Sequence, residues 1–164
     1  MLRTTSFPLT LQKRRGAAAV ELALVLPLFF SLAFIGIESG HALNVVQKLE
    51  TAVRDGGRLA AKDIDPAMLQ SGQTANQKVI SDITNMLKAE GIPGSSITVT
   101  ITHADGANVG QVFDLSLTSN QYKLMKIYIT VPYADVGMFP MSISPSKILN
   151  ATLVISRGRS TLNL

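Results

Sequence analysis

Residues 16–37 read GAAAVELALVLPLFFSLAFIGI, and this stretch decides the fold. It contains a single charged residue, Glu21, and a single proline, Pro27. About twenty mainly apolar residues in a helix, each rising about 1.5 Å, match the roughly 30 Å hydrocarbon core of a bilayer. We therefore expect one transmembrane helix over about residues 17–37.

Basic residues lie immediately before this stretch. Lys13, Arg14 and Arg15 precede Gly16, whereas Glu38 and His41 follow the other end. The positive-inside rule therefore predicts a cytoplasmic N-terminus and a chain that continues on the outer side of the membrane. An ordinary cleaved signal peptide fits less well, because its apolar region usually has about 7 to 15 residues and ends at a small-x-small site.

The formal net charge of +4 comes from this basic flank. Arg3, Lys13, Arg14 and Arg15 precede Gly16, and the 11 other Lys and Arg residues balance the 11 Asp and Glu residues. The charge therefore reports membrane topology, and we expect no nucleic-acid partner. Cysteine is absent, which excludes disulfides, thiolate metal sites and thiol nucleophiles.

Glu21 is the unusual residue of the apolar stretch. A carboxylate deep in a bilayer costs roughly 2.5 to 3.5 kcal/mol on insertion scales, and less near the interface. Two interpretations follow from the residues alone. Glu21 is either a functional group whose partner lies elsewhere, or a side chain that favours the positive helix end and snorkels to the headgroups.

Two segments carry a family resemblance. Residues 14–28, RRGAAAVELALVLPL, and residues 52–61, AVRDGGRLAA, resemble the N-terminal part of TadE-like proteins, minor pseudopilins of the tight-adherence (Flp, type IVc) pilus system. The resemblance covers about residues 14–62. Leu22 departs from the family pattern, in which an aromatic residue is common at this position.

The resemblance implies a processing step and an assembly contact. A prepilin peptidase would cut after Gly16, so that Ala17 becomes the N-terminus and the leader, residues 1–16, has no fold of its own. Glu21 would pair with the free N-terminus of a neighbouring subunit, and two opposite charges in lipid would then offset each other.

The remaining sequence predicts an α+β protein. The helical period continues to Lys62, so we expect one long pilin-like helix over residues 17–62, whose first half is transmembrane. A small domain over residues 63–164 is expected to follow it outside the cytoplasm. A second helix is expected over residues 74–90. Alternating β-branched residues predict an antiparallel sheet of three to four strands, at residues 96–102, 123–131 and 147–156, with a possible short edge strand at 114–118. The segments 103–121 and 132–146 are rich in Gly, Pro, Asn and Ser and are expected to be exposed.

The domain shows no recognisable chemistry. No nucleophile elbow, phosphate loop or dinucleotide fingerprint occurs, so we expect no catalytic residues, no cofactor and no small-molecule substrate. His41 and His103 are the only histidines, and we expect no metal site. His103 and Asp105 could form half of a ligand set or triad, but we interpret His103 as an exposed loop residue. Gly36 and Gly40 have the small-xxx-small spacing of a possible helix-packing face.

These observations favour a non-enzymatic minor pilin or pseudopilin in the inner membrane, with its C-terminal domain outside and possible incorporation into an extracellular pilus. Its partners would be the membrane, prepilin peptidase, other pilin subunits and the inner-membrane assembly platform. The main alternative is an unprocessed bitopic envelope protein with an outer ligand-binding domain. A membrane-anchored hydrolase has no motif in its favour, and a type II secretion pseudopilin would share the same processing.

Overall fold

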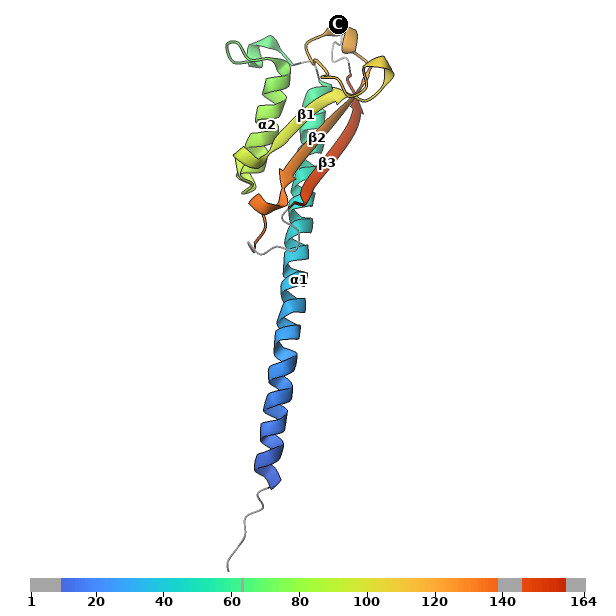
Figure 1. Cartoon of the computed structure of the whole chain (residues 1–164). Coiled ribbons are helices and arrows are strands. Elements are labelled where there is room, and N and C mark those ends of the chain that lie inside the picture. Colours follow the sequence, from blue (N-terminus) through green and yellow to red (C-terminus); the bar gives the residue numbers. More distant parts are fainter. Residues whose placement is uncertain (1–9, 63, 139–145, 159–164) are drawn as a thin grey trace, which may run out of the picture. The chain divides into compact units, whose positions relative to one another are not determined.

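The computed structural model describes residues 10–62, 64–138 and 146–158, and it confirms the α+β class (Figure 1). Two helices and three strands are present, separated by short 3₁₀ turns. They are α1 (Thr10–Ala61), α2 (Ala75–Ala89), β1 (Thr98–His103), β2 (Leu124–Pro132) and β3 (Ile148–Ser156). The chain divides into two compact units, one up to Ser39 and the other from Gly40 onward. The second half of α1 therefore belongs to the globular unit.

Local sequence explains where α2 begins and ends. Thr74 and Gln77 form a capping box, in which each side chain accepts a hydrogen bond from the backbone N–H of the other residue. The helix is followed by Gly91, which has a φ of 87° that a side chain would disfavour, and then by Pro93. The predicted second helix is thus confirmed to within a residue at either end.

The sheet is antiparallel throughout, in the order β1-β2-β3. Ile101 lies opposite Ile127 of β2, and Ile127 lies opposite Leu153 of β3. The three main predicted strands are confirmed, but residues 114–118 do not form the fourth. The isolated bridges of this loop lie earlier, at Val109 and Val112.

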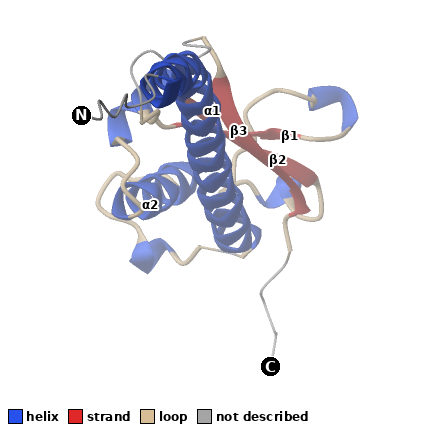
Figure 2. Ribbon diagram, turned by 90° about the horizontal axis from the view of Figure 1, so that it is seen from below, coloured by secondary structure: helices blue, strands red, loops and turns tan. Residues whose placement is uncertain are grey.

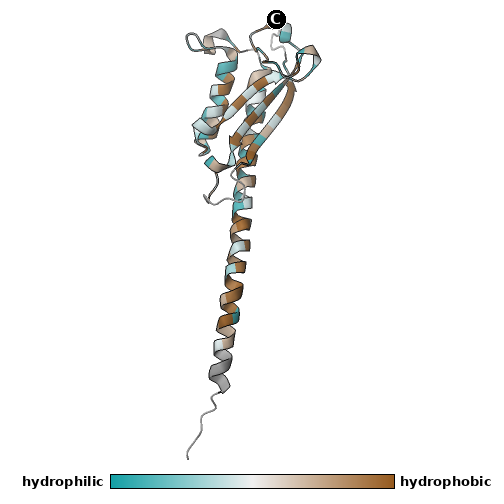
Figure 3. Cartoon of the chain, viewed as in Figure 1, coloured by the Kyte–Doolittle hydropathy of each residue, from teal (hydrophilic) through white to brown (hydrophobic). Residues whose placement is uncertain are grey.

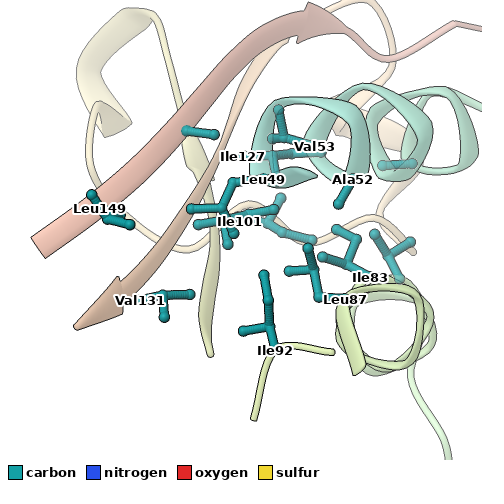
Figure 4. Close-up of a cluster of buried hydrophobic side chains, with 14 of the residues drawn as sticks. Leu49, Ala52, Val53, Ile83, Leu87, Ile92, Ile101, Ile127, Val131 and Leu149 are labelled. Atoms are coloured by element: carbon teal, nitrogen blue, oxygen red, sulfur yellow. The ribbon is translucent and has the colours of Figure 1, made fainter. Parts of the chain in front are cut away.

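Both helices of the globular unit lie on one face of the sheet (Figure 2). Apolar side chains from α1, α2 and the strands' inner face meet there in one cluster (Figure 4). Leu49, Leu87 and Ile127 are fully buried, and each such side chain contributes roughly 1.5 to 3 kcal/mol. Because cysteine is absent, packing of this kind must hold the unit together.

Two adjacent glycines let α1 approach both of its neighbours. A Cβ on Gly56 would collide with Cδ1 and Cγ1 of Ile83 in α2, and a Cβ on Gly57 would collide with Cδ2 of Leu153 in β3. Glycine normally costs about 1 kcal/mol in a helix interior relative to alanine. Here close packing on two sides compensates for that cost.

The segment between β1 and β2 is not the exposed loop that its composition suggests. Phe113 and Leu115 are buried. The Asn76 side chain of α2 donates from Nδ2 to the Phe113 carbonyl at 2.6 Å and accepts from the Leu115 N–H at 2.8 Å. Tyr133, which follows β2, is also buried, so the prediction of exposure fails at the start of that segment too. Residues 139–145 of it lie outside the described part of the chain.

The two edges of the sheet differ. The Phe113 N–H donates to the Ile101 carbonyl, and the Gly110 N–H donates to the His103 carbonyl, so the chain's own loop closes the β1 edge. Along β3 the antiparallel alternation turns every second residue outward, and no described segment bonds to that edge. The sequence of β3, ILNATLVIS, contains neither charge nor proline.

Candidate functional site

The first unit presents an apolar helix surface that the chain itself does not cover. Leu24, Phe29 and Leu32 are 75%, 65% and 62% exposed, respectively. Figure 3 shows the hydrophobic colours along the first half of α1. Within the described residues, α1 is the one helix long and apolar enough to cross a membrane. Exposure of large apolar side chains on every side indicates a surface made for lipid or for neighbouring helices.

Pro27 is accommodated within this helix, which continues past it without a break in its assignment. Proline has no N–H and leaves one carbonyl of the preceding turn without its usual donor. One turn later, the Ser31 hydroxyl donates to the Pro27 carbonyl at 2.8 Å. The polar hydrogen of Ser31 is thereby satisfied within the helix, as an apolar environment requires.

Gly16, Ala17 and Glu21 lie on the same continuous helix, and all three are exposed. Ala17 and Glu21 are four residues apart and therefore share one face. The Glu21 carboxylate makes no ion pair or hydrogen bond with any described residue. Any partner of this charge would therefore lie outside the described residues.

The helix begins at Thr10 and not at Ala17. Residues 10–16 of the expected leader thus extend α1, while residues 1–9 lie outside the described part. The removal of the leader stays a prediction. Helical geometry continues backward through Gly16 because no proline or capping residue stops it there. The side chains of Lys13, Arg14 and Arg15 are also outside the described part, so the predicted basic flank stays a prediction.

Gly36 and Gly40 leave an open surface on α1. A Cβ at either position would meet no atom within 4 Å. Another helix could approach closely there, as small residues one turn apart permit. Their role as a packing face stays a prediction, since the chain itself places nothing against them.

The histidines occupy different environments. Nε2 of His41 lies 2.7 Å from the Val136 carbonyl, which ties α1 to the segment after β2. His103 is the last residue of β1 and is only 7% exposed, so its interpretation as an exposed loop residue is wrong. Strand alternation explains this burial, because His103 shares the inner face with Ile101.

The fold and the apolar helix together define a class: a protein with one span-length helix at its N-terminus that continues into a small α+β domain. This arrangement fits a membrane-anchored protein. Residues 16–58 match the family model of TadE-like protein, so this segment is similar to TadE-like proteins. The resemblance seen in the sequence is therefore confirmed. No curated protein and no solved structure matches the chain.

The family match indicates a protein associated with the tight-adherence pilus. The matched residues begin at Gly16 and end at Arg58, so they include Glu21, the apolar stretch and the Gly56–Gly57 pair. The second helix and the sheet lie outside the match. The functional roles of Gly16 and Glu21 stay predictions, and the burial of His103 was not predicted from the sequence.

Proposed function

We propose that the protein is a minor pilin or pseudopilin of a tight-adherence pilus, cut by prepilin peptidase after Gly16 and then assembled with other pilin subunits. One observation carries the proposal. An uncovered apolar helix bears Gly16, Ala17 and an unpaired Glu21 within the segment that matches the TadE-like family.

The uncovered apolar surface of α1 suits both the membrane-bound subunit and the assembled subunit. In the membrane, lipid surrounds the apolar side chains of residues 17–37. In an assembly, sibling helices take the place of lipid, and van der Waals packing drives their association. The N-terminus faces the cytoplasm, where the peptidase cuts, and the globular unit faces outward.

Glu21 supplies the contact that orders the assembly. Cleavage after Gly16 creates a positively charged amine on Ala17. In a dry helix bundle, the carboxylate of one subunit and the amine of its neighbour offset charges that would each be costly alone. The lack of any partner for Glu21 within the described chain agrees with a partner in another subunit.

Processing is tested by intact-mass spectrometry of the membrane-extracted protein, produced with and without the cognate prepilin peptidase. We expect loss of residues 1–16 only when the peptidase is present. Gly16→Leu should block the loss, whereas Gly36→Leu, the same change elsewhere on α1, should not. An unprocessed chain in both strains would instead favour the bitopic anchored protein with an outer ligand-binding domain.

Assembly is tested separately with Glu21→Gln, which keeps the shape of the side chain but removes its charge. Processing should be unchanged, while cross-linking to other pilin subunits and recovery in sheared filaments should fall sharply. Glu50→Gln is the matched control, because Glu50 is an exposed α1 residue outside the apolar stretch. Normal incorporation of Glu21→Gln would contradict the assembly role and leave the processing step standing.

A further inference from the structure

A polar cavity lies at the end of the sheet where β1 finishes and β2 begins. Its volume is about 230 Å³, and its lining comes from His103, Asp105, Gly106, Ala107, Asn108 and Lys123. The Arg157 N–H donates to the Lys123 carbonyl, and the Gly158 N–H donates to the Ala61 carbonyl. The cavity is therefore at the end of the globular unit where α1 ends. Figure 1 shows this end of the unit, where β1 also finishes.

His103 is the residue that makes this cavity a candidate binding site. Its side chain lines the cavity although the residue is 93% buried, and it makes no hydrogen bond with any described residue. The ring nitrogens are not sealed from solvent, and the cavity that His103 lines is where water can reach them. A ligand that enters the cavity can therefore exchange hydrogen bonds with the imidazole in place of water.

The surrounding structure holds His103 in place. Its N–H donates to the Gln111 carbonyl at 2.9 Å, and its carbonyl accepts from the Gly110 N–H at 3.0 Å. The imidazole ring packs on the buried ring of Phe113, with 4.6 Å between centroids. Phe113 is itself fixed through its carbonyl by Asn76. The imidazole is thus pre-positioned, which lowers the entropy cost of binding.

The other polar groups of the cavity offer both donors and acceptors. Asp105 contributes acceptors, Lys123 contributes donors, and the Asn108 amide contributes both. Asp105 and Lys123 do not form an ion pair with each other, so both remain available. The closest described partner of the Lys123 ammonium is the Asn120 Oδ1 atom, at a long 3.4 Å.

The charges and hydrogen-bonding groups that line the cavity fit few classes of ligand. A metal ion would find only two strong ligands, His103 and Asp105, beside the repelling charge of Lys123, and the described residues contain no group of three metal-binding side chains. An anion would be attracted by Lys123 but repelled by Asp105, so the lining gives it no net charge complementarity. An apolar ligand would leave every polar group in the lining without a partner.

We propose that this cavity binds a neutral polyhydroxylated ligand, a single sugar residue of a glycan, through His103, Asp105, Asn108 and Lys123. Sugar hydroxyls donate and accept in turn, so one ring can satisfy carboxylate, amide, imidazole and ammonium groups together. The volume is below the roughly 300 to 1,000 Å³ of sites for drug-sized ligands, which fits one ring and not an oligosaccharide. The inference is independent of processing and assembly, and it adds a surface-binding function.

The test is a titration of the full-length, isotope-labelled protein, followed by NMR chemical shifts of backbone amides. The detergent must lack a sugar headgroup, because such a headgroup would compete. The probes are glucose, galactose, mannose and N-acetylglucosamine, each up to high millimolar concentration, with glycine and Zn²⁺ as probes of the zwitterion and metal classes. We expect at least one sugar to shift the amides of His103, Gly106 and Lys123 saturably in the millimolar range.

Variants separate specific binding from general effects. Asp105→Asn changes an exposed residue and should weaken sugar binding at least tenfold without unfolding the domain. Asp135→Asn is the matched control at the opposite end of β2, and it should bind normally. Equal binding by Asp105→Asn and the wild type, or no saturable shift with any of the four sugars, would overturn the proposal. Stronger binding of glycine or Zn²⁺ at the same amides would also overturn it.

Discussion

Gly56→Ala adds one methyl group at a crowded point of α1, where the new Cβ meets Cδ1 and Cγ1 of Ile83. Ile83 is 1% exposed and surrounded by other core side chains, so it has no free space into which to turn. Overpacking of a closed core costs typically about 1 to 3 kcal/mol. Replacing glycine by alanine inside a helix returns about 1 kcal/mol. We therefore expect a net loss of up to about 2 kcal/mol in the free energy of unfolding.

Thermal unfolding of the full-length protein in detergent, followed by near-UV circular dichroism, measures this loss. In the tyrosine band the signal reports on the globular unit, because all 3 tyrosines lie in it and tryptophan is absent. A loss of 2 kcal/mol corresponds to a fall in Tm of roughly 8 °C for a domain of this size. Gly57→Ala should cost less, since its obstacle is one methyl of the half-buried Leu153.

Two controls identify the cause of the loss. Gly40→Ala should not lower Tm, because no atom lies within 4 Å of the new Cβ. In a double-mutant cycle, Ile83→Ala should remove the clash, so that Gly56→Ala costs at least 1 kcal/mol less in that background, a coupling of about the size seen for contacting residues. A coupling of zero between the two substitutions in this cycle would refute the close-packing argument.

Two further predictions concern the segment between β1 and β2. Asn76→Ala removes both hydrogen bonds to this segment and leaves the Leu115 N–H without a partner. We therefore expect the free energy of unfolding to fall by about 1 to 3 kcal/mol, measured through Tm as above. Asn85→Ala, at an exposed position of the same helix, is the control and should leave Tm nearly unchanged. Hydrogen bonds from the Ser116 hydroxyl and N–H, with a smaller contribution from the charge of Arg157, lower the pKa of Asp114 below its unfolded value of about 3.9. Ionised Asp114 therefore stabilises the folded protein at pH values above its unfolded pKa, and this stabilisation is lost as the pH falls through its folded pKa. The difference in Tm between the wild type and Asp114→Asn should accordingly disappear in acid. A difference that stays constant from neutral pH into acid would contradict this origin.

Local signals were sufficient to predict the regular elements. The capping residue Thr74, the stop at Gly91 and the two-residue period of the strands each act within a few neighbouring residues. The sequence also drew attention to Glu21, because a carboxylate is costly in an apolar stretch, whereas Gly16 was assigned as a cleavage site only through the resemblance to TadE-like proteins. The roles of both residues stay predictions.

The buried parts of the loops could not be predicted in this way. Phe113 and Leu115 stand among Gly, Asn and Ser, and their burial depends on Asn76, which is more than thirty residues away in the chain. His103 was missed by a single position, because β1 ends at His103 whereas the predicted strand stopped at Thr102. One residue of strand length decides whether this imidazole faces solvent or the inner side of the sheet.

The open, uncharged edge of β3 has a consequence for how copies of this protein can meet. Edges of this kind readily pair with one another, and sheets usually guard them with charges or proline. Antiparallel pairing of two β3 strands would turn one globular unit end for end, so that the two chains leave the pair at Gly40 in opposite directions. Self-association through β3 is therefore expected when the protein is purified in detergent.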